Sequence, residues 1–240
     1  MQQNKISILS TRPLNDSLVA DATAAGIYID ELSFIETEPI QTIEVLQEIE
    51  KSFLQVETVV FTSMNAVEAV ATVKGEQQPG WKIYCIGNTT KLLVKKYFGE
   101  DSIAGTADSA AELAELIVEE AATEKIIFFC GDQRRAELPE ILHNNKIDVN
   151  EIIVYHTITV PHKIEKEYSG ILFFSPSAVE SFFNTNKINE QTILFAIGNT
   201  TAAEIKRYTN NTTVISEEPG KENLVRQMIE YCTSATNQNN

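Results

Sequence analysis

Cysteine is scarce in this sequence, which excludes several kinds of site. Among 240 residues there are three cysteines, at Cys85, Cys130 and Cys232, with no CxxC pair. This spacing predicts neither a disulfide framework nor a zinc site. Cys85 and Cys130 lie within apolar runs, so we expect both thiols in the hydrophobic core.

Glycine and proline are also sparse, with ten and seven residues respectively. Such a composition excludes low-complexity and collagen-like chains, and 43% hydrophobic with 22% charged residues is typical of a globular protein. A length of 240 residues fits one large domain or two small ones, either of which can bury a core.

Long apolar runs are missing too. The longest, such as TVVF and ILFF, cover only four to six residues, whereas a membrane-spanning helix needs roughly 20. The N-terminal segment MQQNKISILSTRP has too short an apolar stretch for the core of a signal peptide. We therefore expect a cytoplasmic protein with no membrane partner.

Positively charged residues are also few compared with acidic ones. The chain has 19 lysines and arginines against 34 acidic residues, giving a net charge of −15. This balance argues against nucleic acid as a partner, because nucleic acid requires a basic face. Solubility is the simplest explanation for the acidity, although a local site can still bind an anion.

What the sequence does contain is an internal repeat. The pentapeptide IGNTT occurs at Ile86–Thr90 and, 111 positions later, at Ile197–Thr201. The similarity extends to two further pairs of segments, Val59–Val70 with Ile171–Phe182 and Ser109–Glu120 with Gly220–Tyr231. About 60 residues are thus duplicated. Two distant copies indicate two similar domains rather than a solenoid.

Each copy has the same order of local signals. A short β-rich run is followed by a turn of small polar residues and then by apolar residues at helical spacing. Repeated strand–loop–helix units predict parallel sheets with helices on both faces. The predicted fold class is therefore α/β, with two similar domains, each a parallel sheet flanked by helices and joined by a two-stranded β linker.

Two more segments, near the N-terminus and at Lys125–Tyr155, read as strand, helix and strand. If each domain takes one, the chain begins domain one, builds all of domain two and then returns. The extended segments Ser33–Ile40 and Val154–Pro161 are the candidate crossings, and we expect them to pair. The predicted boundaries are 1–35 with 162–233 for domain one, 36–41 and 152–161 for the linker, 42–151 for domain two, and 234–240 for a disordered polar tail.

The turns between strands and helices are the candidate binding sites. Gly87 and Gly198 allow tight turns, and the threonines that follow them offer N-cap hydroxyls, namely Thr89, Thr90, Thr200 and Thr201. Free N–H groups and the helix dipole make such a turn an anion site. Plain helix capping explains any single turn, whereas recurrence in both halves favours binding. The sequence has neither a GxxxxGK[ST] nor a GxGxxG motif.

Other polar candidates have two readings each. Arg12, Arg134 and Arg135 follow predicted strands, where they either bind carboxylates or form salt bridges with the many acidic residues. Tyr155, at the second crossing, either faces a cleft or is a packed linker aromatic. The histidines show no HExxH spacing and are expected to be solvated, at His143, His156 and His162.

Seven motifs in order make the sequence similar to the uroporphyrinogen-III synthase family. They are LSTRPL, VVFTSMNAVEAV, IGNTTKLL, FFCGDQRRAELPEIL, VYHT, FFSPSAVESFF and AIGNTTAAEIK, and the resemblance covers roughly Ile6 to Met228. The resemblance implies two α/β domains joined by a two-stranded linker, with the active site in the cleft. It implies hydroxymethylbilane, a linear tetrapyrrole with eight carboxylates, as substrate. It also implies no metal or cofactor, and we expect a monomer.

The resemblance also assigns roles to single residues. Tyr155, in VYHT, matches the family's cleft tyrosine, and we expect it to act as a weak general acid. Residues on the matching turns are expected to bind substrate through hydroxyls or backbone amides, and Arg12 through its guanidinium; the turn residues are Ser63, Gly87, Thr89, Thr90, Ser175, Ser177, Gly198, Thr200 and Thr201. The chain departs from some relatives in having Met64–Asn65 where Pro–Arg can follow the serine.

Two other functions remain open on the sequence. A non-catalytic clamshell protein that closes on an anionic small molecule would share the repeat and the helix N-termini. Such proteins commonly act outside the cytoplasm, and the missing signal peptide counts against that version. A pair of receiver-like regulatory modules would need acidic clusters and a lysine at the strand ends, where this chain has Ser, Thr and Gly.

Overall fold

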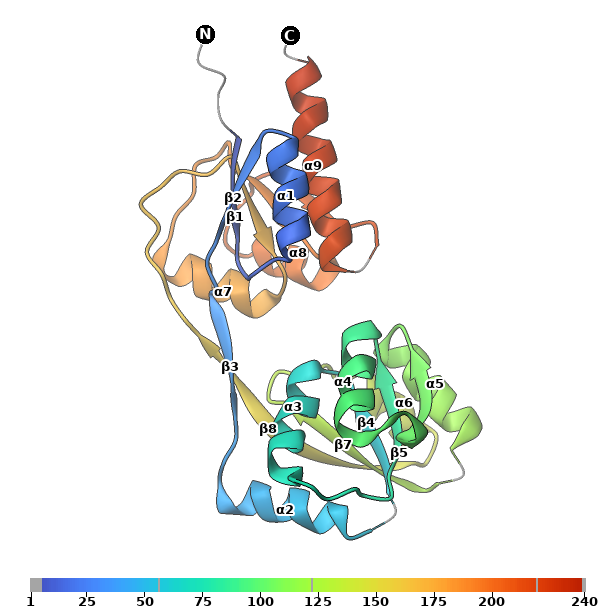
Figure 1. Ribbon diagram of the computed structural model, residues 1–240. Coiled ribbons are helices and arrows are strands. Elements are labelled where there is room, and N and C mark those ends of the chain that lie inside the picture. The colour runs from blue at the N-terminus through green and yellow to red at the C-terminus, as the bar shows by residue number, and fades with distance from the viewer. Residues whose placement is uncertain (1–5, 56, 122, 219, 239–240) are drawn as a thin grey trace. The chain divides into compact units, whose positions relative to one another are not determined.

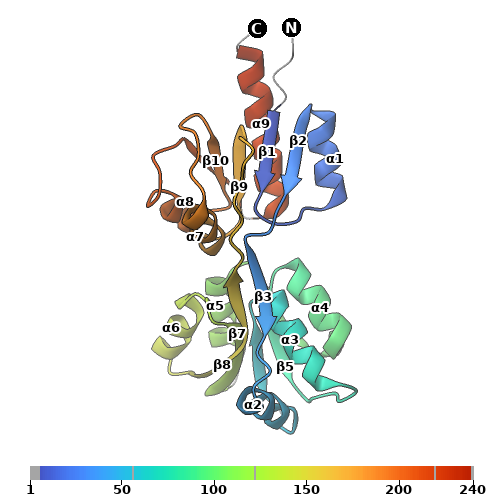
Figure 2. The same cartoon turned by 90° about the vertical axis from the view of Figure 1, so that its left-hand side faces the viewer.

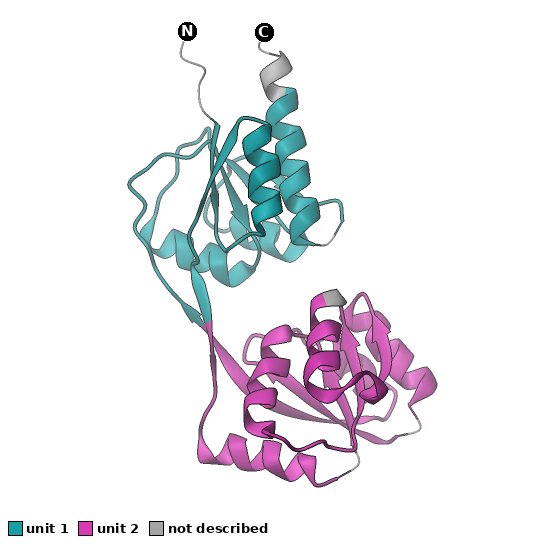
Figure 3. Cartoon of the chain, in the orientation of Figure 1, with its two compact units in different colours: residues 1–36, 158–240 teal, residues 37–157 magenta. Residues whose placement is uncertain are grey.

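The computed structural model describes residues 6–55, 57–121, 123–218 and 220–238. The chain forms two compact units (Figure 3). Unit 1 contains residues 1–36 and 158–240, and unit 2 contains residues 37–157. One unit is therefore built from two distant parts of the chain, and the other is continuous.

Unit 2 is built on a largely parallel sheet. Its strand order is β3-β8-β7-β4-β5-β6, and the five strands from β8 to β6 pair in parallel. The bounds are β3 Ile35–Pro39, β4 Thr58–Phe61, β5 Lys82–Ile86, β6 Ile103–Ala107, β7 Lys125–Gly131 and β8 Asp148–Thr159. Central strands such as TVVF and KIIFFCG are almost continuously apolar because helices cover both of their faces.

Helices cover both faces of this sheet (Figure 2). Helices α2, α3 and α4 pack on one face around Phe61, Trp81 and Phe129, and α5 and α6 pack on the other around Val60 and Phe128. The bounds are α2 Ile43–Phe53, α3 Met64–Lys74, α4 Asn88–Phe98, α5 Ala110–Glu120 and α6 Glu137–Asn144. Burial of each large apolar side chain contributes about 1.5–3 kcal/mol, so this two-sided core holds the strand ends in place.

Unit 1 has the same layered construction (Figure 1). Its strand order is β11-β10-β9-β1-β2, with parallel pairing throughout. Helices α1 and α9 pack on one face and α7 and α8 on the other. The bounds are β1 Ile6–Ser10, α1 Asp16–Ala24, β2 Ile27–Glu31, β9 Gly170–Phe173, α7 Pro176–Thr185, β10 Ile193–Ala196, α8 Asn199–Ile205, β11 Thr213–Ile215 and α9 Lys221–Gln238.

The two sheets are copies of one another. Strands β8-β7-β4-β5-β6 of unit 2 correspond in order to β2-β1-β9-β10-β11 of unit 1. The N-terminal strand β1 pairs with β9, and β7 pairs with β4, so each unit takes one of the two strand–helix–strand segments. The predicted fold class, a parallel α/β sheet flanked by helices in each of two similar halves, is confirmed.

The two predicted crossing segments are neighbours. Strand β3 lies beside β8, and their pairing is antiparallel, because the Ile40 N–H donates to the Val154 carbonyl at 2.9 Å and the Val160 N–H donates to the Phe34 carbonyl at 2.9 Å. The second crossing is not a separate strand. It is the final part of the 12-residue strand β8, whose first part pairs with β7.

The predicted disordered tail is wrong over residues 234–238. Helix α9 continues to Gln238, and no glycine or proline interrupts the segment. Residues 239–240 lie outside the described part of the chain.

The prediction that Cys85 and Cys130 lie in the core is confirmed; Cys232 is buried as well, and all three are free thiols. Burial raises the pKa of each thiol to about 11. Across the described residues, no helix is both long and apolar enough to cross a membrane.

Candidate active site

The candidate residues of unit 2 gather where its parallel strands end. Strand β4 leads through Ser63 into α3, β5 leads through Gly87 into α4, and β7 leads through Gly131 toward α6. Tyr155 lies on β8 opposite Gly131. Because all these strands run parallel, their carboxyl ends share one edge of the sheet, which is where α/β proteins bind ligands.

Tyr155 is hydrogen-bonded to the start of helix α3. Its hydroxyl donates to Ser63 Oγ at 3.0 Å, and Ser63 Oγ accepts from the Asn65 N–H at 3.2 Å. Ser63 is thus the N-cap of α3 and also the partner of the phenol. The Tyr155 ring packs against the apolar cluster on that face, so the residue combines apolar packing of its ring with a hydrogen bond from its hydroxyl.

The environment keeps the Tyr155 phenol protonated. Burial raises the pKa of Tyr155 above the ordinary tyrosine value, and Cys130 and Asp132 raise it further, against the opposing effect of hydrogen bonds with Ser63 and Asn65. At neutral pH the side chain is therefore a proton donor and not a phenolate. A weak acid of this kind can assist the departure of a leaving oxygen.

In unit 2, the GNTT turn begins a helix without a side-chain cap. Gly87 is the N-cap residue of α4 and has φ +68°, a conformation that favours glycine. Thr89 and Thr90 lie inside the first turn, so the expectation that they cap the helix is wrong. Thr89 is exposed, whereas Thr90 is buried at 7% exposure.

A groove of about 370 Å³ adjoins this turn. Its lining includes Gly87 and Lys91 on one side and Asp108 and Glu112 on the other. The groove therefore brings one ammonium together with two carboxylates beside the start of α4, where the Gly87 N–H already donates to the Ala107 carbonyl at 3.2 Å.

The second GNTT turn, in unit 1, has a different backbone. Gly198 has φ 178°, which is extended backbone that any residue adopts, so the expected need for glycine in a tight turn is wrong here. Thr200 and Thr201 again lie inside the first turn of an uncapped helix, α8, and do not cap it. Thr200 is exposed, and Thr201 is buried at 1% exposure.

The SPSA turn of unit 1 is a conventional N-cap. Ser175 Oγ accepts from the Ala178 N–H at 3.2 Å, and Pro176 occupies the first helical position of α7. Proline fits there because its missing N–H would have no intrahelical partner. Ser177 lies half-buried in the first turn.

Replacing Ser175 with alanine should lower the free energy of unfolding by about 1 kcal/mol, because one first-turn N–H of α7 loses its acceptor. Urea unfolding followed by far-UV circular dichroism measures this change. Tryptophan fluorescence would not report on α7, because the single tryptophan lies in unit 2 and α7 lies in unit 1. Ser175→Thr retains the hydroxyl and should stay close to wild type. Equal midpoints for Ser175→Ala and wild type would contradict the capping role.

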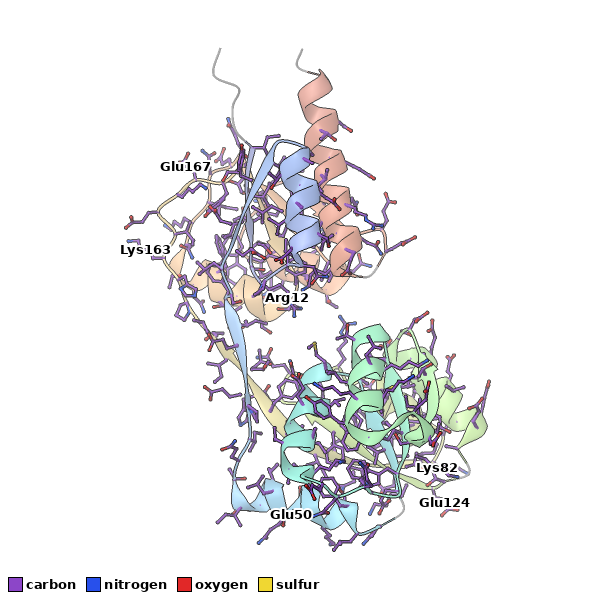
Figure 4. The ribbon with its side chains drawn as sticks, viewed as in Figure 1. Arg12, Glu50, Lys82, Glu124, Lys163 and Glu167 are labelled. Carbon is purple, nitrogen blue, oxygen red and sulfur yellow. The ribbon has the colours of Figure 1, made fainter. Side chains whose placement is uncertain are left out.

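Arg12 follows strand β1 and is accompanied by a second cation. Figure 4 shows Arg12 at the end of unit 1 where β1 terminates. Its guanidinium carbon lies 6.0 Å from the Phe174 ring centre, and burial by surrounding atoms lowers its pKa. Lys221, the first residue of α9, donates from Nζ to the Pro13 carbonyl at 2.9 Å.

The Arg12 and Lys221 charges act on each other. Burial lowers the pKa of Lys221, and the Arg12 charge lowers it further, while Glu222 and Glu31 oppose this. Within the described part of the chain neither cation forms an ion pair with a carboxylate. Sequence reasoning missed Lys221. The available signal was a lysine in the first turn of a helix, where the dipole disfavours positive charge.

The remaining basic candidates have structural partners. Arg134 Nε donates to the Glu151 carboxylate, so of the two interpretations of this arginine the structure has the salt bridge. His156 Nδ1 lies 3.1 Å from Asp132 Oδ2. The expectation of a solvated His162 is wrong, because its Nε2 lies 3.0 Å from the Ser33 carbonyl and its ring packs edge-on against Phe34. His143 is exposed as expected.

No group of three or more His, Cys, Asp or Glu side chains with the proximity for a metal ion occurs among the residues described. Three residues near Tyr155 were missed by sequence reasoning, namely Asn65, Gly131 and Asp132. Their importance depends on contacts between strands that are distant in sequence.

Known proteins share this architecture. The family model described as uroporphyrinogen-III synthase HemD matches residues 16–226. Uroporphyrinogen-III synthetase from Helicobacter pylori is similar in structure, with a TM-score of 0.67 at 18% identity, covering 94% of this chain and 99% of that one. A mutant uroporphyrinogen III synthase from the extremely thermophilic bacterium Thermus thermophilus has a TM-score of 0.62 at 12% identity, covering 96% of this chain and 99% of that one.

The two structural likenesses concern the fold, and they extend over nearly the full length of each chain. The family model spans both units and includes Ser63, Tyr155 and the two GNTT turns. The chain belongs to the uroporphyrinogen-III synthase family, whose members are cyclising lyases of haem biosynthesis.

Proposed function

We propose that this protein converts hydroxymethylbilane into uroporphyrinogen III, with inversion of ring D and loss of water. The observation that carries the proposal is the hydrogen bond from the Tyr155 hydroxyl to Ser63 Oγ, at the carboxyl edge of the unit 2 sheet. Membership of the family supplies the reaction class.

The first step is departure of the hydroxyl group on the ring A side of the linear tetrapyrrole. The pyrrole nitrogen pushes electrons toward the breaking C–O bond, Tyr155 donates a proton to the departing oxygen, and water leaves. The product of this step is an azafulvene cation. Tyr155 acts as a weak general acid, which suits a substrate that supplies most of the electronic push itself.

The carbon skeleton then rearranges. Ring D attacks through its substituted carbon to form a spirocyclic pyrrolenine, which fragments and closes again with ring D inverted. Loss of the proton displaced at ring closure regenerates neutral pyrroles and balances the proton donated earlier. The main tasks of the protein are to hold the chain in a folded conformation and to stabilise the cationic intermediates.

Each unit has groups suited to the acetate and propionate arms of this substrate. In unit 2 these are the amides of Thr89 and Thr90 in the first turn of α4, the Gly87 turn that leads into this helix, and the Ser63 hydroxyl. In unit 1 they are the turns at Ser175–Ser177 and Gly198–Thr201, together with Arg12 and Lys221. These local groups oppose the repulsion that a net charge of −15 exerts on a polyanion.

A coupled assay tests the proposal directly. Hydroxymethylbilane is generated in place, this protein is added, the product is oxidised, and the porphyrin isomers are separated. Predominantly type III porphyrin is expected. Only the type I isomer, which forms spontaneously, under conditions where a known synthase yields type III, would overturn the proposal in favour of an anion-binding protein without this activity.

Thr200→Val should raise the Michaelis constant about tenfold with little change in turnover, because a hydroxyl bonded to a carboxylate contributes about 1.5 kcal/mol or more. Initial rates over a range of substrate concentrations provide the measurement. Thr200→Ser keeps the hydroxyl and should behave like wild type. If the valine and serine variants have equal Michaelis constants, the hydroxyl does not contact substrate.

We further assign a cytoplasmic location and a monomeric state, with no cofactor. The absence of a spanning helix in the described residues is compatible with that location. Size-exclusion chromatography with light scattering tests the monomer.

A further inference from the structure

The loop that follows strand β7 contacts Tyr155 in several independent ways. We propose that Gly131 and Asp132 are positioning residues that hold the Tyr155 side chain against Ser63. The positioning is inferred from geometry alone. Its effect on catalysis rests on the proposed function.

The first observation is a β-bulge directly before Tyr155. Cys130 pairs with Ile153, and Gly131 pairs with Tyr155, so Val154 is an extra residue on β8. Side chains normally alternate between the faces of a strand, yet Val154 and Tyr155 both contact the cluster on the α3 side of the sheet. A bulge redirects a side chain in this way, and here it turns the phenol toward Ser63.

The second observation is the lack of space above Gly131. A Cβ atom built on Gly131 would lie 2.4 Å from Tyr155 Cζ, 2.6 Å from Cε2 and 2.7 Å from the hydroxyl oxygen. Gly131 is not among the glycines with positive φ, so its backbone tolerates alanine. The glycine is therefore required for the tyrosine ring to occupy its position.

The third observation is the set of contacts made by Asp132 with the residues around Tyr155. The Asp132 N–H donates to the Tyr155 carbonyl at 3.2 Å, and Oδ1 accepts from the Thr157 N–H at 3.0 Å. Oδ2 lies 3.1 Å from His156 Nδ1. One residue thus fixes three consecutive positions of β8, beginning with Tyr155.

Substitution of Gly131 tests the positioning by kinetics. Gly131→Ala should lower the turnover number about 100-fold, the loss typical of a displacement near 1 Å, yet change little in a Tyr155→Phe background, because both changes remove the same function. Independent, multiplicative losses in the double variant would overturn the proposal. Wild-type turnover of Gly131→Ala would do so as well.

Gly105→Ala is the matched control for crowding. A Cβ atom on Gly105 would lie 2.7 Å from the Tyr84 ring and 2.8 Å from Leu116, also in unit 2 but against a tyrosine without a role in the mechanism. It should lose stability comparably to Gly131→Ala while retaining turnover. A 100-fold loss in this control would mean that any crowding of unit 2 abolishes activity, and would overturn the specific role of Gly131.

A spectroscopic measurement tests the positioning without activity. With 13Cζ-labelled tyrosine, the Tyr155 signal is identified among seven tyrosines by its absence in Tyr155→Phe. Asp132→Asn keeps the side-chain oxygen that accepts from Thr157 but removes a charge that raises the Tyr155 pKa together with Cys130, so the phenol should titrate at lower pH than in wild type. Ser63 and Asn65 are unchanged by this substitution.

An unchanged Tyr155 titration in both Asp132→Asn and Gly131→Ala would overturn the positioning. If instead the titration shifts but wild type yields only type I porphyrin, the positioning stands and the proposed function fails. The two failures are thus distinguishable.

Discussion

Tyr155→Phe should lower the turnover number at least about 100-fold, the range for loss of a general acid. The substitution removes the hydroxyl that donates to Ser63 but keeps the ring that fills the adjoining apolar cluster. Loss of one hydrogen bond costs only about 1 kcal/mol of stability, so the fold should persist. Turnover by isomer-resolved assay, alongside circular dichroism, measures both effects.

The pH dependence follows from the same environment. The donor is the protonated phenol, and its pKa lies above the ordinary value of 10.0, mainly because of burial. The contribution of Tyr155 is therefore complete throughout the neutral range and is lost only as the pH rises through that elevated pKa. A wild-type profile that loses the Tyr155 contribution below about pH 8, well under the ordinary tyrosine pKa, would contradict this assignment.

Tyr97→Phe is the control. Tyr97 packs against the same apolar cluster, but its hydroxyl accepts from Lys96 Nζ at 3.2 Å, whereas the Tyr155 hydroxyl donates to Ser63. This variant should keep wild-type turnover. If Tyr155→Phe did the same, the phenol would have no part in the chemistry, and the packed-aromatic interpretation would be sufficient.

Phe61→Ala should lower the free energy of unfolding of unit 2 by about 3–5 kcal/mol. The side chain is fully buried and stacks on Phe129 and Phe98 at centroid distances of 5.5 and 6.0 Å. Its removal leaves a cavity beneath a close-packed aromatic group. The ring centroid of Trp81, the single tryptophan, lies 5.4 Å from that of Phe98, so Trp81 fluorescence reports unfolding of this unit in denaturant.

Phe61→Leu is the matched variant, because it keeps most of the apolar volume while removing the ring stacking. Its loss should be clearly smaller than that of Phe61→Ala. An alanine variant with an unchanged midpoint of the Trp81 transition would show that the aromatic group is not part of the cooperative core of unit 2.

The layered fold was predictable because its signals are local and occur twice. Apolar strands, small polar turns and helical spacing recur in both halves, and the same strand order follows in both sheets. The serine caps at Ser63 and Ser175 were predictable for the same reason, since an N-cap depends only on residues two or three positions away.

The details of the site were less predictable because they depend on contacts distant in sequence. The same letters, GNTT, give φ +68° at Gly87 and 178° at Gly198, so the local sequence alone does not determine the backbone there. Gly131 matters only because of the Tyr155 ring, and Lys221 only because of Arg12. None of these pairings has a signature within one segment.

The discontinuity of unit 1 has a consequence for the order of folding during synthesis. Strand β1 lies between β9 and β2, in the interior of its sheet. The ribosome therefore makes β1, α1 and β2 first, and this strand–helix–strand segment must wait until all of unit 2 has been made before β9 emerges. At ordinary elongation rates the delay is on the order of ten seconds. Unit 2, being continuous, can acquire its core in that interval, so the part of the enzyme that is translated first is completed last.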